Sequence, residues 1–140
     1  MDFGVLGPLR AWAGGRPLPV RPGKTRVLLA ALLLRANRVV PTEMLVDTMW
    51  DGHPPPTCVA ALHNYVMRLR RCLGGNGPAP IRTVDRGYLV EVPDNGLDLW
   101  RFTAIRDRGK RSAERGRWAD AAKEFGAALA LWRGTPLSDV

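Results

Sequence analysis

The sequence contains few of the residues that build catalytic or metal centres, since only two histidines and two cysteines occur among its 140 residues. Cys58 and His63 are five residues apart, which on a helix separates them by about 140° around the axis and disfavours a shared metal ion. No histidine stands with a nucleophile, and no two carboxylates share a credible site for acid–base chemistry. The sequence therefore predicts a protein that is no enzyme and that holds no metal and no cofactor.

Long apolar runs are also missing. The longest, VLLAALLL at 27–34, has eight residues, whereas a membrane-spanning helix needs about 20. The first ten residues, MDFGVLGPLR, include an acid at the second position and no long apolar core, which disfavours a secretory signal. Cys58 and Cys72 would lie roughly 21 Å apart along one helix, too far for a disulfide. We therefore expect a cytoplasmic protein without a membrane-spanning segment.

Acidic residues are outnumbered by basic ones, 13 to 21, which gives a net charge of +8 and a pI of about 10.7. Of the basic residues 18 are arginines, whose planar guanidinium matches the geometry of phosphate. A hydrophobic fraction of 46% is enough for a core, so this charge belongs to a folded protein. Such a balance favours a nucleic acid or an anionic membrane surface as the partner and does not choose between them.

Short apolar segments and two helices are expected in the first 50 residues. Residues 3–12 and 16–20 are separated by two glycines, a pattern typical of a small antiparallel sheet. Residues 23–38 are rich in leucine and alanine and too long for a strand, so they predict a helix. A second, shorter helix is expected over 41–50, because a Pro-Thr pair is a start signal.

A third helix and a hairpin follow. The three prolines within 51–56 predict a stiff loop, because proline is excluded from a helix interior. Thr57 is a favourable N-cap and the glycines at 74–75 are a stop signal, which predicts a helix between them. β-branched residues on both sides of DRG predict a β-hairpin over 81–92. A sheet, three helices and a hairpin in this order predict an α+β fold, a winged helix-turn-helix with an additional N-terminal sheet.

Beyond residue 95 the pattern becomes purely helical, and we place a domain boundary there, between residues 1–95 and 96–140. Two helices, over 97–116 and 117–134, are expected to form a helical hairpin. Because two helices have difficulty burying an apolar face alone, we expect this unit to pack on the first domain or on another chain. The scattered tryptophans are expected mostly in the core. One face of the second helix collects Trp118, Ala121, Ala122, Phe125, Leu129 and Trp132.

The third helix has two different faces. One is an apolar stripe that predicts core packing, made of Val59, Leu62, Val66, Leu69 and Leu73. The opposite face is small at its start and gains arginines toward its end: Thr57, Ala60, Ala61, Asn64, Met67, Arg68 and Arg71. On such a face Asn64 could pair with adenine, and Arg68 could bind guanine or a phosphate. The alternative is that these arginines are simply solvated.

Neighbouring segments support a nucleic-acid interpretation. A short helix, a stiff turn and a basic helix form the helix-turn-helix order, in which the second helix enters the major groove. Arg86 stands near the hairpin tip, where it either contacts the minor groove or phosphate or remains a surface charge. Lys24 and Arg26 lie in or beside a GKT triplet, but position 18 is leucine, which excludes a phosphate-binding loop. These two cations either contact DNA phosphate or are ordinary charges at a helix start.

Several segments resemble, in order, those of the Streptomyces antibiotic regulatory protein (SARP) family: FGVLGPLRAW, KTRVLLAALLLRANRVV, LVDTMW, ALHNYVMRLRRCLG and GYLVEV. The final ALALWRGTPLSDV resembles the opening of that family's bacterial transcriptional activation domain. The resemblance runs from about residue 2 to the last residue. It implies an OmpR/PhoB-type winged helix followed by a tetratricopeptide-like helical domain, of which residues 96–140 are a truncated start.

The resemblance also implies a function. SARP members activate biosynthetic gene clusters, bind direct repeats near the −35 promoter element as side-by-side protomers, and recruit RNA polymerase through its sigma and alpha subunits. By position, 57–74 is then the recognition helix and 82–90 the wing, although many relatives have Arg-Pro-Pro where this chain has Val84-Asp85-Arg86. The loop implied to face polymerase comprises Asp51, Gly52, His53, Pro54, Pro55 and Pro56.

We therefore expect a sequence-specific, nucleoid-associated DNA-binding activator of a secondary-metabolite cluster, such as one for an antibiotic, with no membrane partner. Asn64 and Arg68 are expected to read base edges. Further contacts to DNA are expected from Thr57, Arg70, Arg71, Thr83 and Arg86, besides Lys24 and Arg26. One alternative is a protein-interaction module that is built on the helical hairpin and does not bind DNA. Another is a winged helix that binds RNA.

Overall fold

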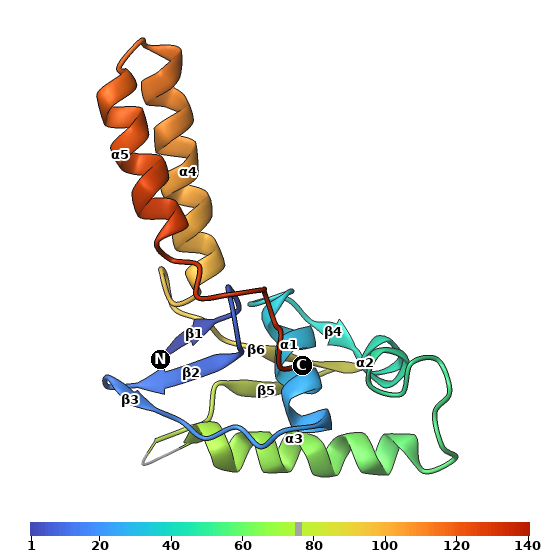
Figure 1. The fold of residues 1–140 in the computed structure, drawn as a ribbon. Helices are drawn as coiled ribbons and strands as arrows, with labels where there is room; N and C mark the ends of the chain where they lie inside the picture. The colour runs from blue at the N-terminus through green and yellow to red at the C-terminus, as the bar shows by residue number, and fades with distance from the viewer. Residues whose placement is uncertain (75–76) are drawn as a thin grey trace.

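The computed structural model describes residues 1–74 and 77–140. It shows an α+β fold in which three helices and two small sheets form a winged helix, and a helical hairpin projects from it (Figure 1). This confirms the expected fold class. None of the helices in the described part is long and apolar enough to cross a membrane. The elements are β1 (Asp2–Gly4), β2 (Arg10–Ala13), β3 (Arg16–Pro17), α1 (Lys24–Leu33), β4 (Val40–Pro41), α2 (Thr42–Met49), α3 (Cys58–Gly74), β5 (Ile81–Val84), β6 (Gly87–Val90), α4 (Asp98–Glu114) and α5 (Trp118–Leu129).

The N-terminal sheet is antiparallel, as its segments predict, with the strand order β1-β2-β3. Phe3 pairs with Ala11 and is completely buried. It also forms a parallel bridge with Leu97, and its N–H donates to the carbonyl of Gly96 at 2.7 Å. The first strand therefore holds the chain directly before α4.

Helix α1 ends at Leu33, earlier than the predicted helix over 23–38. After Leu34 the N–H groups of Arg35 and Ala36 bond three residues back, and the turn then reaches Asn37, which has a left-handed φ of 64°. Its side-chain amide donates to the carbonyl of Val92 at 3.0 Å, and its side-chain oxygen accepts the N–H of Val92 at 2.8 Å. A right-handed helix cannot continue through such a residue. The contact joins the end of α1 to the strand region after β6.

The wing hairpin forms where the sequence predicts it, but it has a third strand that the sequence interpretation missed. Val40 of β4 pairs with Tyr88 of β6, so the sheet order is β4-β6-β5. Gly87 lies so close to β4 that a Cβ at this position would collide with the carbonyl oxygen of Val40. Backbone contacts therefore attach the wing to the chain just before α2, and only glycine fits at its base.

Helices α1, α2 and α3 share one hydrophobic core, and the inner face of α3 follows the prediction with one exception. Val59 is 63% exposed, so its expected place in the core stripe is wrong. Cys58, one turn before Leu62, packs against the core instead. The remaining members of the stripe are at most 1% exposed: Leu62, Val66, Leu69 and Leu73.

Helices α4 and α5 form the predicted hairpin, joined at Gly116 with a φ of 72°. Gly109 of α4 is buried under Phe125 of α5, and a Cβ at position 109 would lie 2.7 Å from that ring. The absence of a side chain at this position lets the two helices approach closely.

The apolar face expected on α5 is mostly uncovered, because a pair of helices offers only one surface for mutual contact. Trp118 and Leu129 are 70% and 66% exposed, and Trp132 is 40% exposed. The expected place in the core is therefore wrong for Trp118 and Trp132. Among the other tryptophans, Trp50 and Trp100 do pack against the core.

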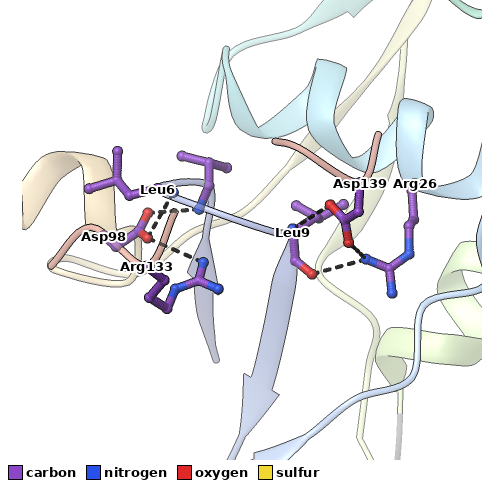
Figure 2. A network of polar contacts seen from close by, with 7 residues as sticks. Leu6, Leu9, Arg26, Asp98, Arg133 and Asp139 are labelled. Atoms are coloured by element: carbon purple, nitrogen blue, oxygen red, sulfur yellow. Dashed lines mark hydrogen bonds and ion pairs between the residues drawn. The ribbon is translucent and has the colours of Figure 1, made fainter. Parts of the chain in front are cut away.

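The chain after α5 returns to the N-terminal segment and fixes the hairpin to the winged helix (Figure 2). Asp98, at the start of α4, is buried, and its carboxylate accepts the N–H groups of Val5 at 2.8 Å and Leu6 at 3.0 Å. The guanidinium of Arg133 lies 3.7 Å from the same carboxylate. The backbone N–H of Arg133 donates to the carbonyl of Leu6. The buried carboxylate of Asp98 thus binds two backbone N–H groups and lies beside one guanidinium, and a backbone hydrogen bond next to it holds Arg133 in place.

A second contact lies farther along the same segment. Asp139 accepts the N–H of Leu9 at 2.8 Å and pairs with Arg26 of α1 at 2.5 Å. Arg26 also donates to the carbonyl of Leu9 at 3.0 Å. Residues 133–139 therefore connect the loop after β1 to α1 and fasten the base of the helical hairpin to the winged helix.

Candidate nucleic-acid interface

The outer face of α3 is exposed and basic. No acidic residue occurs between Asp51 and Asp85. Within residues 1–74 and 77–140, neither Arg68 nor Arg71 has an ion-pair partner. The positive potential of this face is therefore not compensated by neighbouring side chains. Its exposed residues include Ala60, His63, Asn64, Met67, Arg68 and Arg71.

Arg68 lies over an aromatic ring. Its guanidinium carbon is 5.3 Å from the ring centroid of Tyr65, and this ring is 6.4 Å from that of Trp50. Such a cation–π contact attracts the guanidinium to the ring without using any of its N–H groups in a hydrogen bond. Arg68 is thus restrained by the ring while its N–H groups remain available to a base or a phosphate.

Arg70 points to the wing instead of the outer face. Its Nε donates to the carbonyl of Ile81 at 3.3 Å, and its Nη2 donates to the hydroxyl of Thr83 at 2.7 Å. Two of the residues predicted to contact DNA are therefore bonded to each other. This pair connects α3 to β5 and sets the position of the wing beside the helix.

Lys24 and Arg26 are also engaged within the protein. Lys24 donates to the carbonyl of Met49 at 2.6 Å and lies 5.3 Å from the ring centroid of Trp50. Arg26 is held by Asp139. The structure does not bring either cation to the outer face of α3. Both side chains instead support the contacts among α1, α2 and the C-terminal segment.

The tip of the wing is formed by Asp85 and Arg86, both exposed. Arg86 has a left-handed φ of 65°, and its carbonyl accepts the N–H of Thr42 at 2.9 Å. Its guanidinium has no ion-pair partner in the described part of the chain. The turn therefore presents a free cation at the end of the β5–β6 hairpin.

The proline loop leads directly into α3. Asp51 has a left-handed φ of 52°, and Nδ1 of His53 lies 3.0 Å from its carbonyl. At the end of the loop the carbonyl of Pro55 accepts the N–H of Cys58, and the carbonyl of Thr57 accepts the N–H of Ala61. The loop is thus a mostly exposed surface at the N-terminal end of the basic helix.

Two surface hollows adjoin on α3, and Arg68 and Arg71 line both of them. The first is about 520 Å³ and is also lined by His63, Asn64 and Met67. The second is about 720 Å³ and is lined by residues of α3 and of the segment that runs from β3 to α1. This segment runs alongside α3 (Figure 1). The other lining residues of the second hollow are Leu18, Pro19, Arg21, Thr25 and Cys72.

Arg21 and Thr25 are lining residues that the sequence interpretation missed, since it assigned the contacts of this segment to Lys24 and Arg26. A signal was present for Thr25. It precedes two buried leucines of α1 by three and four residues, which places it on the inner face of that helix. For Arg21 no periodic signal exists, because it lies in the loop before α1.

Two family models match the chain. The model described as "transcriptional regulatory protein, C terminal" matches residues 17–90. The model described as "bacterial transcriptional activator domain" matches residues 97–140. The first match alone covers more than half of the chain.

Curated relatives match the whole chain. Transcriptional regulatory protein EmbR of Mycobacterium tuberculosis is 39% identical, and the match covers 100% of this chain and 37% of EmbR. Regulatory protein DnrI of Streptomyces peucetius is 37% identical, with 54% of its length covered. Regulatory protein AfsR of Streptomyces coelicolor is 36% identical, with 14% covered. The chain thus spans about half or less of the length of these relatives.

A solved structure has the same fold. Mycobacterium tuberculosis EmbR in complex with a low affinity phosphopeptide matches with a TM-score of 0.91 at 39% identity, covering 99% of this chain and 37% of that one. The relatives are transcriptional regulators, which confirms that this chain is not an enzyme. The chain belongs to the Streptomyces antibiotic regulatory protein family of transcriptional regulators.

Proposed function

We propose that this chain binds duplex DNA in a sequence-specific manner and activates transcription. The observation that carries the proposal is the outer face of α3, where Arg68 and Arg71 are exposed beside Asn64 and lack ion-pair partners among the described residues. In the proposed complex α3 lies in the major groove, and Asn64 and Arg68 read base edges. The free cation at the wing tip supports the same mode of binding.

The remaining predicted residues fall into two groups by their contacts. Those with exposed side chains are proposed to bind phosphate or the minor groove: Thr57, Arg71 and Arg86. Those engaged by protein groups are proposed to position the interface: Lys24, Arg26, Arg70 and Thr83. Removing a positioning residue would move α3 or the wing, whereas removing an exposed one would delete a contact.

Family membership supports finer proposals about partners. We propose that two protomers bind side by side on direct repeats near the −35 element of a promoter for a secondary-metabolite cluster, such as an antibiotic cluster. The loop over 51–56 is proposed to face RNA polymerase, through its sigma or alpha subunits. The proposal is supported by the position of the loop at the N-terminal end of α3. In the proposed complex the loop lies next to the DNA groove that α3 enters. Such a protein acts in the cytoplasm, at the nucleoid. We also propose a domain boundary near residue 95, between the winged helix and the helical hairpin.

Affinity for a promoter direct repeat is expected to fall steeply with salt, by about one power of salt concentration for each phosphate contact. Fluorescence anisotropy of a labelled repeat, titrated with protein at several salt concentrations, measures this slope. A scrambled duplex of equal length measures the sequence-independent part. An affinity that does not change with salt would contradict DNA binding. It would favour a protein-interaction module, for which the exposed Trp118 and Leu129 of α5 provide a surface.

The RNA-binding alternative needs a separate measurement. Structured RNA of the same length competes with the labelled duplex in the same anisotropy assay. We expect the RNA to compete no better than the scrambled duplex, because a deep and narrow RNA major groove does not admit α3. Displacement by RNA at concentrations where the scrambled duplex is inactive would favour the RNA-binding function.

Arg86→Gly is expected to weaken DNA binding while leaving the free energy of unfolding within about 0.5 kcal/mol of wild type. Glycine relieves the left-handed backbone strain at this position but adds freedom to the unfolded chain, and the two effects nearly cancel. Loss of the cation should reduce the salt slope by about one. Arg86→Lys, which keeps both the charge and the strained backbone, is the control and should retain the slope. Equal slopes for all three proteins would show that the wing tip does not touch phosphate.

A further inference from the structure

The hollow of about 720 Å³ between α3 and the segment before α1 has the properties of an anion site. Arg21, Arg68 and Arg71 line it, and none of its lining residues is acidic. Within the described ranges none of the three arginines has an ion-pair partner. Three cations around one hollow repel each other unless an anion lies between them.

Thr25 gives an independent indication of a ligand. The residue is 4% exposed and lines the hollow, yet no hydrogen bond to another described residue engages its hydroxyl. The hydroxyl is not one of the fully buried atoms that lack a partner, so it is open to the hollow, where a ligand can accept its hydrogen bond. The first turn of α1 also has no side-chain cap and no acidic residue, so the positive end of its dipole is uncompensated. A bound anion would satisfy both features.

We infer that this hollow holds a backbone phosphate of the DNA read by α3, which Arg21 and Thr25 contact directly. The inference rests on the proposed function. Arg68 and Arg71 line this hollow and also the one beside Asn64, so an anion here adjoins the strand that α3 reads. Leu18 and Pro19 complete the wall with apolar surface. Such a surface favours contact with the sugar next to a phosphate over contact with a second charged group. The site fixes the register of the duplex on α3 and carries no base preference itself.

Arg21→Ala tests the inference, with Arg108→Ala as the matched control. Arg108 is exposed on α4, in the hairpin that projects away from α3 (Figure 1), so both variants lose one surface charge. We expect Arg21→Ala to weaken binding about fivefold to tenfold at roughly 0.1 M salt and to reduce the salt slope by about 0.9. The ratio of affinities for the promoter repeat and the scrambled duplex should stay unchanged. Arg108→Ala should change neither quantity.

Thr25→Val removes the hydroxyl at nearly constant side-chain size. We expect roughly threefold weaker binding, from the loss of one hydrogen bond to phosphate. The thermal midpoint should not fall, because the hydroxyl has no partner within the described residues. A lowered midpoint together with unchanged binding would show that the hydroxyl serves the fold and not a ligand.

Single methylphosphonate linkages in the duplex identify the phosphate. Neutralising one linkage beside the α3 half-site should weaken wild type and leave Arg21→Ala unaffected, because the contact is already missing in that variant. If wild type binds DNA and Arg21→Ala behaves like Arg108→Ala at every linkage, the inference is wrong while the proposed function stands. If inorganic pyrophosphate binds wild type but not Arg21→Ala, and the salt slope of DNA binding is the same in both proteins, the hollow holds a free anion instead of a DNA phosphate. Absence of any duplex binding by wild type would remove both proposals.

Discussion

Asp98→Ala is expected to lower the free energy of unfolding by about 3–5 kcal/mol. The carboxylate is buried and accepts the N–H groups of Val5 and Leu6 (Figure 2). Alanine would leave both donors without a partner and would remove the negative charge 3.7 Å from Arg133. The terminal nitrogens of Arg133 are buried and form no hydrogen bond of their own, so this guanidinium depends on Asp98 for its compensation. Breaking a buried pair on one side is costly for this reason.

Urea denaturation followed by circular dichroism measures the change. Asp94→Ala is the control, because this carboxylate is exposed four residues earlier and should matter by less than about 0.5 kcal/mol. Asp98→Asn keeps the size and one acceptor oxygen but loses the charge, so its loss should lie between those of the other two variants. A change below about 1 kcal/mol for Asp98→Ala would show that the hairpin is held to the winged helix mainly by apolar contacts.

Elements with a strong local signal could be predicted from the sequence. The helices and the wing hairpin follow from periodicity, prolines and glycines, which act over a few residues. Strand β4 has no such signal, because two residues become a strand only through their pairing with Tyr88. The early end of α1 likewise depends on Asn37 bonding to Val92. Both features depend on partners that lie about 50 residues away in the sequence, so no local pattern predicts them.

The candidate interface divides in the same way. Helical period places Asn64, Arg68 and Arg71 on one face of α3 regardless of the surroundings, and the structure exposes all three. The contacts of Arg70 and Arg26 could not be predicted, because their partners lie in β5 and at the far end of the chain. From the sequence alone, an arginine that is bonded within the protein cannot be distinguished from one that is available to DNA. The uncovered face of α5 has the same cause, since periodicity indicates an apolar face without showing what covers it.

Arg68→Ala is expected to cost about 1–3 kcal/mol in binding to the preferred repeat and to relax the sequence preference at the base that it reads. The reason is its position: it lies on the exposed face of α3, and the ring of Tyr65 holds its guanidinium at 5.3 Å. Arg71→Ala removes the same charge one turn later and is expected to weaken binding to all sequences about equally. Anisotropy titrations on the repeat, on single-base variants and on the scrambled duplex separate the two behaviours.

The stacked ring makes a second comparison possible. Tyr65→Leu leaves Arg68 in place but removes the surface that orients it, so binding should weaken less than with Arg68→Ala while the base preference still broadens. Arg68→Lys keeps the charge without the planar fork and should retain the salt slope but lose the preference. If Arg68→Ala weakens the repeat and the scrambled duplex by the same factor, Arg68 holds a phosphate. Base reading would then rest on Asn64 and the small residues at the start of α3, and the duplex would lie nearer the proline loop.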